Sequence, residues 1–124
     1  MGDRRVILVV EDDDQTTLFM SHILEREGYA VKVATNGEEV AEKMEEGLAA
    51  LVTLDIDLPD TTGDELMLKF KTTPGWDVVP IVMVTGKPKG TGSTWAVKTG
   101  SKAHLEKPFK PKELIDCVNR LLAR

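Results

Sequence analysis

Apolar residues along the chain gather in short runs, and stretches with helical periodicity separate these runs. Five runs have the length of a β-strand and lie at residues 6–10, 30–34, 49–54, 78–84 and 103–105. The first run contains only valine, isoleucine and leucine. An unbroken run of this kind is typical of a strand that is buried on both faces of a parallel sheet. The pattern therefore predicts a parallel sheet.

Amphipathic stretches follow the apolar runs. The first predicted helix starts at one of three capping residues, Asp13, Asp14 or Thr16, and stops before Gly28. Its apolar positions recur at helical spacing and are Leu18, Phe19, Ile23 and Leu24. The other predicted helices cover residues 38–46, 64–72, 91–98 and 111–122. Because each right-handed crossover covers one face of a parallel sheet, five strand and helix pairs predict a doubly wound α/β domain.

The composition of the chain excludes several classes of protein. A chain of 124 residues with 41% hydrophobic content fits one compact domain, residues 1–124. The net charge of −5 offers no broad positive field, so direct nucleic-acid binding is not expected. Cys117 is the only cysteine, which excludes an internal disulfide or a cysteine-rich zinc site. No apolar stretch approaches the roughly 20 residues of a membrane span, so we expect a soluble, cytoplasmic protein.

Chemically distinctive residues follow the predicted strands. Glu11 and Asp12 come after the first strand, Asp55 ends the third, Thr85 follows the fourth and Lys107 follows the fifth. The carboxyl ends of neighbouring parallel strands meet at one edge of the sheet, where open α/β folds bind their ligands. We therefore expect these side chains to converge on a single crevice.

Clustered carboxylates repel one another, and a bound cation relieves the repulsion. Hard oxygen ligands suit Mg²⁺ or Mn²⁺, and Asp12 at the strand edge is a better ligand candidate than Asp13 and Asp14, which the helix start needs. A carboxylate such as Asp55 can also attack phosphorus and form an acyl phosphate.

Thr85 and Lys107 are the candidates for holding the remaining phosphoryl oxygens. Each has a plain alternative: Thr85 as a strand-end residue with a satisfied hydroxyl, and Lys107 as one of many surface lysines. Because residues suited to this chemistry follow four different strands, it is much less plausible that all of them are there by coincidence.

The order of these motifs resembles the response-regulator receiver domain of two-component signalling, the CheY-like family. From about Arg5 to Leu122 the chain shows an acid pair, Leu-Asp-x-x-Leu-Pro, Val-Thr-Gly and Lys-Pro-Phe, in that order. The resemblance implies a flavodoxin-like five-stranded sheet of order 2-1-3-4-5 with five helices. It also implies that Asp55 accepts a phosphoryl group from a histidine kinase or a histidine phosphotransfer protein.

The resemblance also assigns roles around Asp55. Asp12 is implied as a direct metal ligand and Glu11 as one that acts through water, and the backbone carbonyl of Asp57 completes the protein ligands. Thr85 is implied as the switch hydroxyl and Lys107 as the lysine that pairs with the phosphate. The family's small residue that leaves access to the phosphate matches Gly86.

Output in this family commonly uses the face of the fourth helix, fifth strand and fifth helix, for a downstream protein or for a homodimer. No effector domain follows Arg124, so output by docking is the expectation. The family usually carries Tyr or Phe three residues before the lysine, whereas this chain has His104. A smaller, ionisable ring could weaken the switch or make it pH-sensitive. The alternative is that His104 is merely exposed. A cis peptide bond is expected between Lys107 and Pro108.

Two other functions stay open on sequence grounds. Asp55-Ile56-Asp57 resembles the nucleophile and general-acid pair of haloacid-dehalogenase-like phosphatases, although that motif usually follows the first strand and the chain is short for such an enzyme. A pseudo-receiver, which has the fold and binds a partner without being phosphorylated, is the other alternative. The complete set of expected site residues argues against it, whereas His104 keeps it open.

Overall fold

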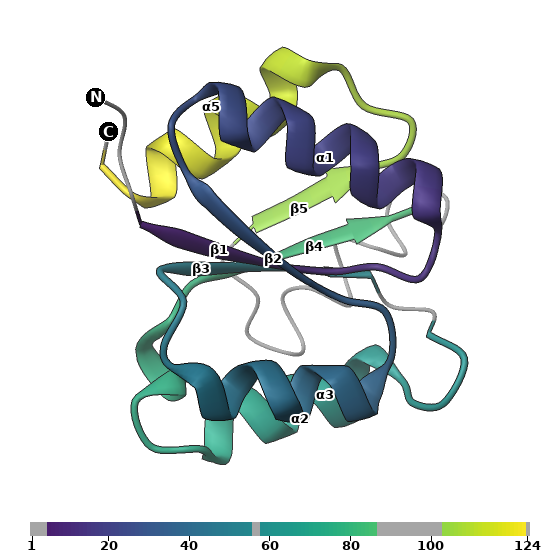
Figure 1. Cartoon of the computed structure of the whole chain (residues 1–124), viewed down its shortest axis with the longest axis vertical. Helices are drawn as coiled ribbons and strands as arrows, with labels where there is room; N and C mark the ends of the chain where they lie inside the picture. Colours follow the sequence, from purple (N-terminus) through teal and green to yellow (C-terminus); the bar gives the residue numbers. More distant parts are fainter. Residues whose placement is uncertain (1–4, 56–57, 87–102, 124) are drawn as a thin grey trace.

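The computed structural model describes residues 5–55, 58–86 and 103–123, and they form one parallel sheet between two layers of helices (Figure 1). The strands are β1 (Val6–Val10), β2 (Ala30–Ala34), β3 (Leu51–Asp55), β4 (Ile81–Thr85) and β5 (Ala103–Glu106). The helices are α1 (Asp14–Arg26), α2 (Gly37–Glu46), α3 (Gly63–Thr72) and α5 (Pro111–Leu121), with a short 3₁₀ helix η1 at Trp76–Val78. The helix expected at residues 91–98 lies outside the described residues.

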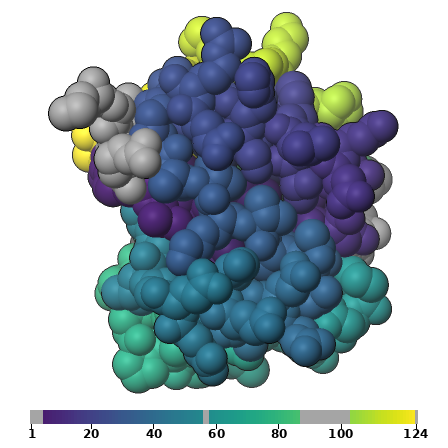
Figure 2. Space-filling view, in the orientation of Figure 1, coloured from purple at the N-terminus to yellow at the C-terminus, as the bar shows by residue number. Residues whose placement is uncertain are grey.

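The strand order is β2-β1-β3-β4-β5, which confirms the predicted doubly wound arrangement. All four strand pairs are parallel. Helices α1 and α5 cover one face of the sheet, and α2 and α3 cover the other (Figure 1). Strand β2 forms one edge, and its dark-blue residues reach the surface between α1 and α2 (Figure 2). This edge explains why β2 is only partly buried although its sequence is apolar at most positions.

Alternating side chains of the central strands divide the core into two clusters. One cluster packs toward α2 and α3 and includes Leu8, Val10, Val52, Leu54, Ile81 and Met83 from the sheet. The other packs toward α1 and α5 and includes Ile7, Val9, Leu51, Val82 and Val84. Both faces of β1 are therefore buried, as the unbroken apolar run predicts.

Local caps define the helix ends. The Asp13 side chain accepts a hydrogen bond from the Thr16 backbone at 2.8 Å and begins α1, so Asp13 is the cap among the three residues that were possible. Gly28, which follows α1, has a φ of 97°, a conformation that glycine adopts without steric cost. Helix α5 begins at Pro111, where a missing amide hydrogen costs nothing.

Parts of the sequence prediction were wrong. The third strand was predicted at residues 49–54, but β3 starts at Leu51 and includes Asp55. Residues 78–84 were predicted as a strand, but Val78 belongs to η1 and the strand starts at Ile81. Trp76 is buried there and Val78 is 78% exposed, so the tryptophan anchors the turn into the core in place of the valine. Leu18 and Phe19 match a helical apolar pattern, yet they are 71% and 42% exposed because other positions of α1 face the core.

None of the helices in the described part of the chain combines the length and the apolar character needed to cross a bilayer.

Candidate functional site

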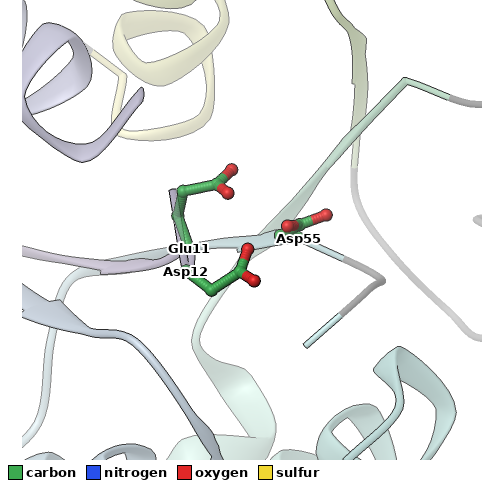
Figure 3. A group of neighbouring side chains, drawn as sticks. All are labelled: Glu11, Asp12 and Asp55. Carbon is green, nitrogen blue, oxygen red and sulfur yellow. The ribbon is translucent and has the colours of Figure 1, made fainter. Parts of the chain in front are cut away.

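Three carboxylates meet at the carboxyl edge of the sheet (Figure 3). Glu11, Asp12 and Asp55 each contribute an oxygen atom that lies within 4.8 Å of the other two. Glu11 is 2% exposed and Asp55 is 7% exposed, whereas Asp12 is exposed at the rim. The convergence predicted from the strand ends is therefore present. Glu11 and Asp55 are buried, and Asp12 is exposed to solvent.

The sheet register produces this convergence. Val10, the last residue of β1, pairs with Leu54, so the acids that follow β1 lie beside Asp55 at the end of β3. The Glu11 backbone amide donates a hydrogen bond to the Ala34 carbonyl at 3.0 Å. That bond continues the hydrogen bonding between β1 and β2 to Glu11, so the sheet fixes the position of the Glu11 backbone.

The buried Glu11 carboxylate has two partners. Its Oε1 atom accepts a hydrogen bond from Lys107 Nζ at 2.6 Å, and its Oε2 atom accepts one from the Asp13 backbone amide at 3.2 Å. Both partners are needed because a carboxylate without water or hydrogen-bond donors would be strongly destabilised in the interior. Glu11 was predicted as a metal ligand, and its pairing with Lys107 was not anticipated.

Lys107 lies between two of the carboxylates. Its Nζ atom is 2.6 Å from Glu11 Oε1 and 3.9 Å from Asp55 Oδ2. Its backbone amide donates to the Thr85 carbonyl at 2.7 Å, so the end of β4 positions the lysine. The peptide bond to Pro108 is cis, as predicted. Lys107 is therefore not one more solvated surface lysine, because its ammonium is directed into the acidic cluster.

The end of β4 supplies two more of the predicted site residues. Thr85 is the last residue of the strand and is 1% exposed. Gly86 follows it, and a Cβ atom placed there would meet no atom of the other described residues within 4 Å.

His104 lies in β5, opposite Met83 of β4. Its Nε2 atom is buried and has no hydrogen-bond partner among the described residues. The side chain is thus partly inside the protein, which does not fit the alternative that it is merely exposed. Asp57 lies outside the described residues.

The donor set fits a hard divalent cation. Three carboxylate oxygens at mutual distances within 4.8 Å, one of them at the solvent-facing rim, leave room for water ligands as well. Mg²⁺ takes oxygen ligands and keeps several of its waters in such partly open sites. Among the described residues, one ammonium against three carboxylates leaves an excess of negative charge that a divalent cation would neutralise.

A pair of aromatic rings lies at the rim of the acidic site, and the sequence analysis did not predict it. The Phe19 ring of α1 and the Phe109 ring lie 5.7 Å apart between centroids. Together with Thr16, Lys107 and Pro108 they line a shallow hollow beside the acidic cluster. The only signal in the sequence was the position of Phe109 two residues after Lys107.

The parallel sheet, the acidic cluster and the inward-facing lysine define a receiver domain. Residues 7–119 match the sequence profile of the response regulator receiver domain, and the chain belongs to this family. This membership sets the phosphatase alternative aside.

Known proteins extend the comparison. The chain is 32% identical over 118 residues to the transcriptional regulatory protein SrrA of Staphylococcus aureus, covering 95% of this chain and 48% of SrrA. It therefore spans about half the length of the curated relatives it matches. A receiver domain protein from Methanospirillum hungatei JF-1 is 34% identical, with a TM-score of 0.85 over 98% of this chain and 95% of that one.

The receiver domain of the sensor histidine kinase PA1611 from Pseudomonas aeruginosa PAO1 has the same fold. It gives a TM-score of 0.88 at 23% identity, over 98% of this chain and all of that chain. That crystal structure has a magnesium ion coordinated in its active-site cleft.

Proposed function

We propose that this receiver domain takes a phosphoryl group onto Asp55 from the phosphohistidine of a histidine kinase or a histidine phosphotransfer protein. One observation carries the proposal. Oxygens of Glu11, Asp12 and Asp55 lie within 4.8 Å of one another, and the Lys107 ammonium lies 3.9 Å from Asp55. A carboxylate nucleophile, a cation site and a fixed ammonium are the parts that phosphoryl transfer to an aspartate needs.

The carboxylates of Asp12 and Asp55 would hold a Mg²⁺ or Mn²⁺ ion directly, and Glu11 would act through a water molecule. Such an ion would neutralise the negative charge that develops on the phosphoryl oxygens. By resemblance to the family, the backbone carbonyl of Asp57 would complete the protein ligands.

In the transfer step an oxygen of Asp55 forms a bond to phosphorus as the bond from phosphorus to the histidine nitrogen breaks. The electron pair of the broken bond stays on the imidazole, and the product is an acyl phosphate. Lys107 and the Thr85 hydroxyl hold the phosphoryl oxygens. Lys107 pairs with Glu11 before the transfer. Its ammonium therefore moves from that carboxylate to a phosphoryl oxygen. By resemblance to the family, Gly86 leaves access for the incoming group.

The acyl phosphate acts as a switch and not as one stage of substrate turnover, so the domain catalyses only its own phosphorylation and dephosphorylation. Thr85 and His104 lie on adjacent strands and are the residues that pass the change to the face of β5, α5 and the helix expected at residues 91–98. A downstream protein or a second copy of the chain binds that face. Phosphorylation shifts an equilibrium between two conformations.

Partners and location follow from charge and chemistry. A net charge of −5 gives this domain no field that would attract a phosphate backbone, so we propose no direct contact with nucleic acid or membrane. The relative SrrA is a transcriptional regulatory protein, and this chain covers 48% of its length. The cytoplasm is the proposed compartment.

A time course with acetyl phosphate tests the proposal. The purified protein is incubated with the donor in Mg²⁺ or in EDTA, and phosphoprotein is separated on a phosphate-affinity gel. We expect phosphoprotein only with Mg²⁺. When the protein is incubated with p-nitrophenyl phosphate instead, we expect no steady turnover. Absence of phosphoprotein in both conditions would establish the pseudo-receiver instead, and sustained turnover would establish a phosphatase.

A further inference from the structure

A hydrogen bond joins the loop after Asp55 to the start of α2. Asp60 Oδ1 accepts this bond from the Gly37 backbone amide at 2.8 Å, although the two residues are 23 positions apart. The described part of the loop before α3, residues 58–62, and the first turn of α2 lie at the same end of the molecule (Figure 1). The contact, which we name the Asp60–Gly37 clasp, ties two separate segments together beside the acidic cluster.

The amide of Gly37 needs a partner from elsewhere. The first amides of a helix have no acceptor within the helix itself. The Asn36 side chain caps the Glu39 amide at 2.8 Å, and the Asn36 carbonyl accepts from Val40, which leaves the Gly37 amide to Asp60. A carboxylate suits this place because the partial positive charge of a helix amino terminus attracts anions.

Packing supports the same contact from the side of α2. A Cβ atom at Gly37 would lie 3.1 Å from Thr61 Cγ2 and 3.3 Å from Asp60 Oδ2. Distances this short require the neighbouring atoms to shift. The loop therefore approaches α2 closely because residue 37 has no side chain. The clasp has two parts, the Asp60 carboxylate and the bare backbone of Gly37.

The clasp connects the two segments that carry the acids. On one side, the loop held by Asp60 begins at Asp55, and Leu58 of this loop packs on the core beneath α2 and α3. On the other side, the Ala34 carbonyl, three residues before Gly37, accepts the Glu11 amide. The end of β2 is thus bonded to the segment with Glu11, and the start of α2, three residues later, is bonded to the loop that follows Asp55.

We propose that Asp60 is a positioning residue for the metal site: through Gly37 it holds the chain that leaves Asp55 in register with the acids after β1. Asp60 is outside the group of carboxylates that lie within 4.8 Å of one another, so it acts through the loop and not as a ligand. This inference rests on the proposed function, because it assumes that Glu11, Asp12 and Asp55 bind a divalent cation.

Titration calorimetry of the unphosphorylated protein with Mg²⁺ tests the inference. Loss of a group that orients a metal ligand typically costs about 10–100-fold in affinity, and a contact one step further out should cost less, about three- to tenfold. We expect Asp60→Ala to weaken Mg²⁺ binding by that amount. Asp60→Asn keeps an oxygen that can accept the Gly37 bond, and it should bind Mg²⁺ within about twofold of wild type.

Two further variants separate position from charge. Asp64→Ala removes the same charge from the nearby first turn of α3 and should leave Mg²⁺ affinity within about twofold of wild type. Gly37→Ala changes no charge, but its Cβ atom requires the side chains of Asp60 and Thr61 to shift, and it should weaken binding in the same direction as Asp60→Ala. Gly37→Ala also tests the clasp independently if Asp60→Ala does not fold, and unfolding curves in EDTA establish that each variant is folded.

The outcomes are distinct. Wild-type affinity in both Asp60→Ala and Gly37→Ala would overturn the positioning role and leave the proposed function standing. Equal weakening by Asp60→Asn and Asp60→Ala would also overturn it, because the effect would then be one of charge. If wild-type protein itself bound no Mg²⁺, the metal site of the proposed function would fail and this inference with it.

Discussion

Lys107 forms its close ion pair with Glu11, at 2.6 Å between Nζ and Oε1, and its distance to Asp55 Oδ2 is 3.9 Å. Glu11 is almost fully buried, whereas the lysine side chain keeps 26% of its surface exposed. The ammonium therefore neutralises a buried carboxylate while it lies beside Asp55, the proposed phosphorylation site. Transfer of the ammonium to a phosphoryl oxygen would leave Glu11 to the metal and its water ligands.

The first prediction concerns the stability of this ion pair. Lys107→Met leaves Glu11 buried without its cation, and breaking a buried pair costs about 3–5 kcal/mol when both partners are fully enclosed. Because Lys107 is partly exposed, we expect a smaller loss of about 2 kcal/mol in the free energy of unfolding. Urea unfolding in EDTA measures it. Lys112→Met, which breaks an exposed pair with Asp116, is the control and should change little. Equal stability of Lys107→Met and wild type would contradict the account.

The second prediction concerns repulsion among the acids. Asp12→Ala should lower Mg²⁺ affinity by about tenfold or more, because it removes a carboxylate that we propose as a direct ligand. The same variant should be at least as stable as wild type in EDTA, since one of three neighbouring negative charges is gone. Calorimetry with Mg²⁺ and thermal unfolding in EDTA give the two quantities. Glu45→Ala, an exposed acid of α2, is the control for both. A variant that bound Mg²⁺ as wild type does would remove Asp12 from the ligand set.

The third prediction concerns a buried hydroxyl in β3. Thr53 is 1% exposed, and its Oγ1 atom has no hydrogen-bond partner among the described residues. Valine has nearly the same shape without the polar atom, so Thr53→Val should stabilise the protein by about 1 kcal/mol. Thr17→Val is the matched control, because the Thr17 hydroxyl donates to the Asp14 carbonyl at 2.8 Å, and it should destabilise. Chemical unfolding of both variants decides the point. Destabilisation by Thr53→Val would mean that its hydroxyl is satisfied.

The fourth prediction concerns pH. Hydrogen bonds from the Thr35 backbone amide and then from its hydroxyl lower the pKa of Glu39 below the ordinary glutamate value. A carboxyl with a lowered pKa in the folded state adds stability above its unfolded pKa and loses it as pH falls through the folded value. We therefore expect Glu39→Gln to flatten the acid side of the stability profile. Unfolding curves from neutral pH down to about pH 3 test this, with Glu45→Gln as control. Parallel profiles for Glu39→Gln and wild type would contradict it.

Much of the fold could be predicted because its signals are local. The unbroken apolar run of β1 predicts burial on both faces, and the acids at strand ends predict a site at one edge of a parallel sheet. Asp55 and Lys107 therefore converge as expected, since parallel register alone brings strand ends together. The family resemblance added the strand order, which apolar runs do not specify.

Other features depend on contacts between segments that are distant in the sequence, and no local sequence pattern predicts them. Lys107 and Glu11 are 96 positions apart, and their preference for each other over Asp55 depends on side-chain geometry within the folded site. The bond from Gly37 to Asp60 is of the same kind. The exposure of Phe19 was missed because helical spacing defines a stripe but not which stripe faces the sheet.

Intact-mass measurement tests the central claim most directly. Wild-type protein and Asp55→Asn are incubated with Mg²⁺ and acetyl phosphate, and their masses are compared before the acyl phosphate hydrolyses. We expect a gain of one phosphoryl group in wild type and no gain in Asp55→Asn. An equal gain in both proteins would place the phosphoryl group on another residue, and a lack of gain in either would show that the acidic cluster does not support phosphorylation.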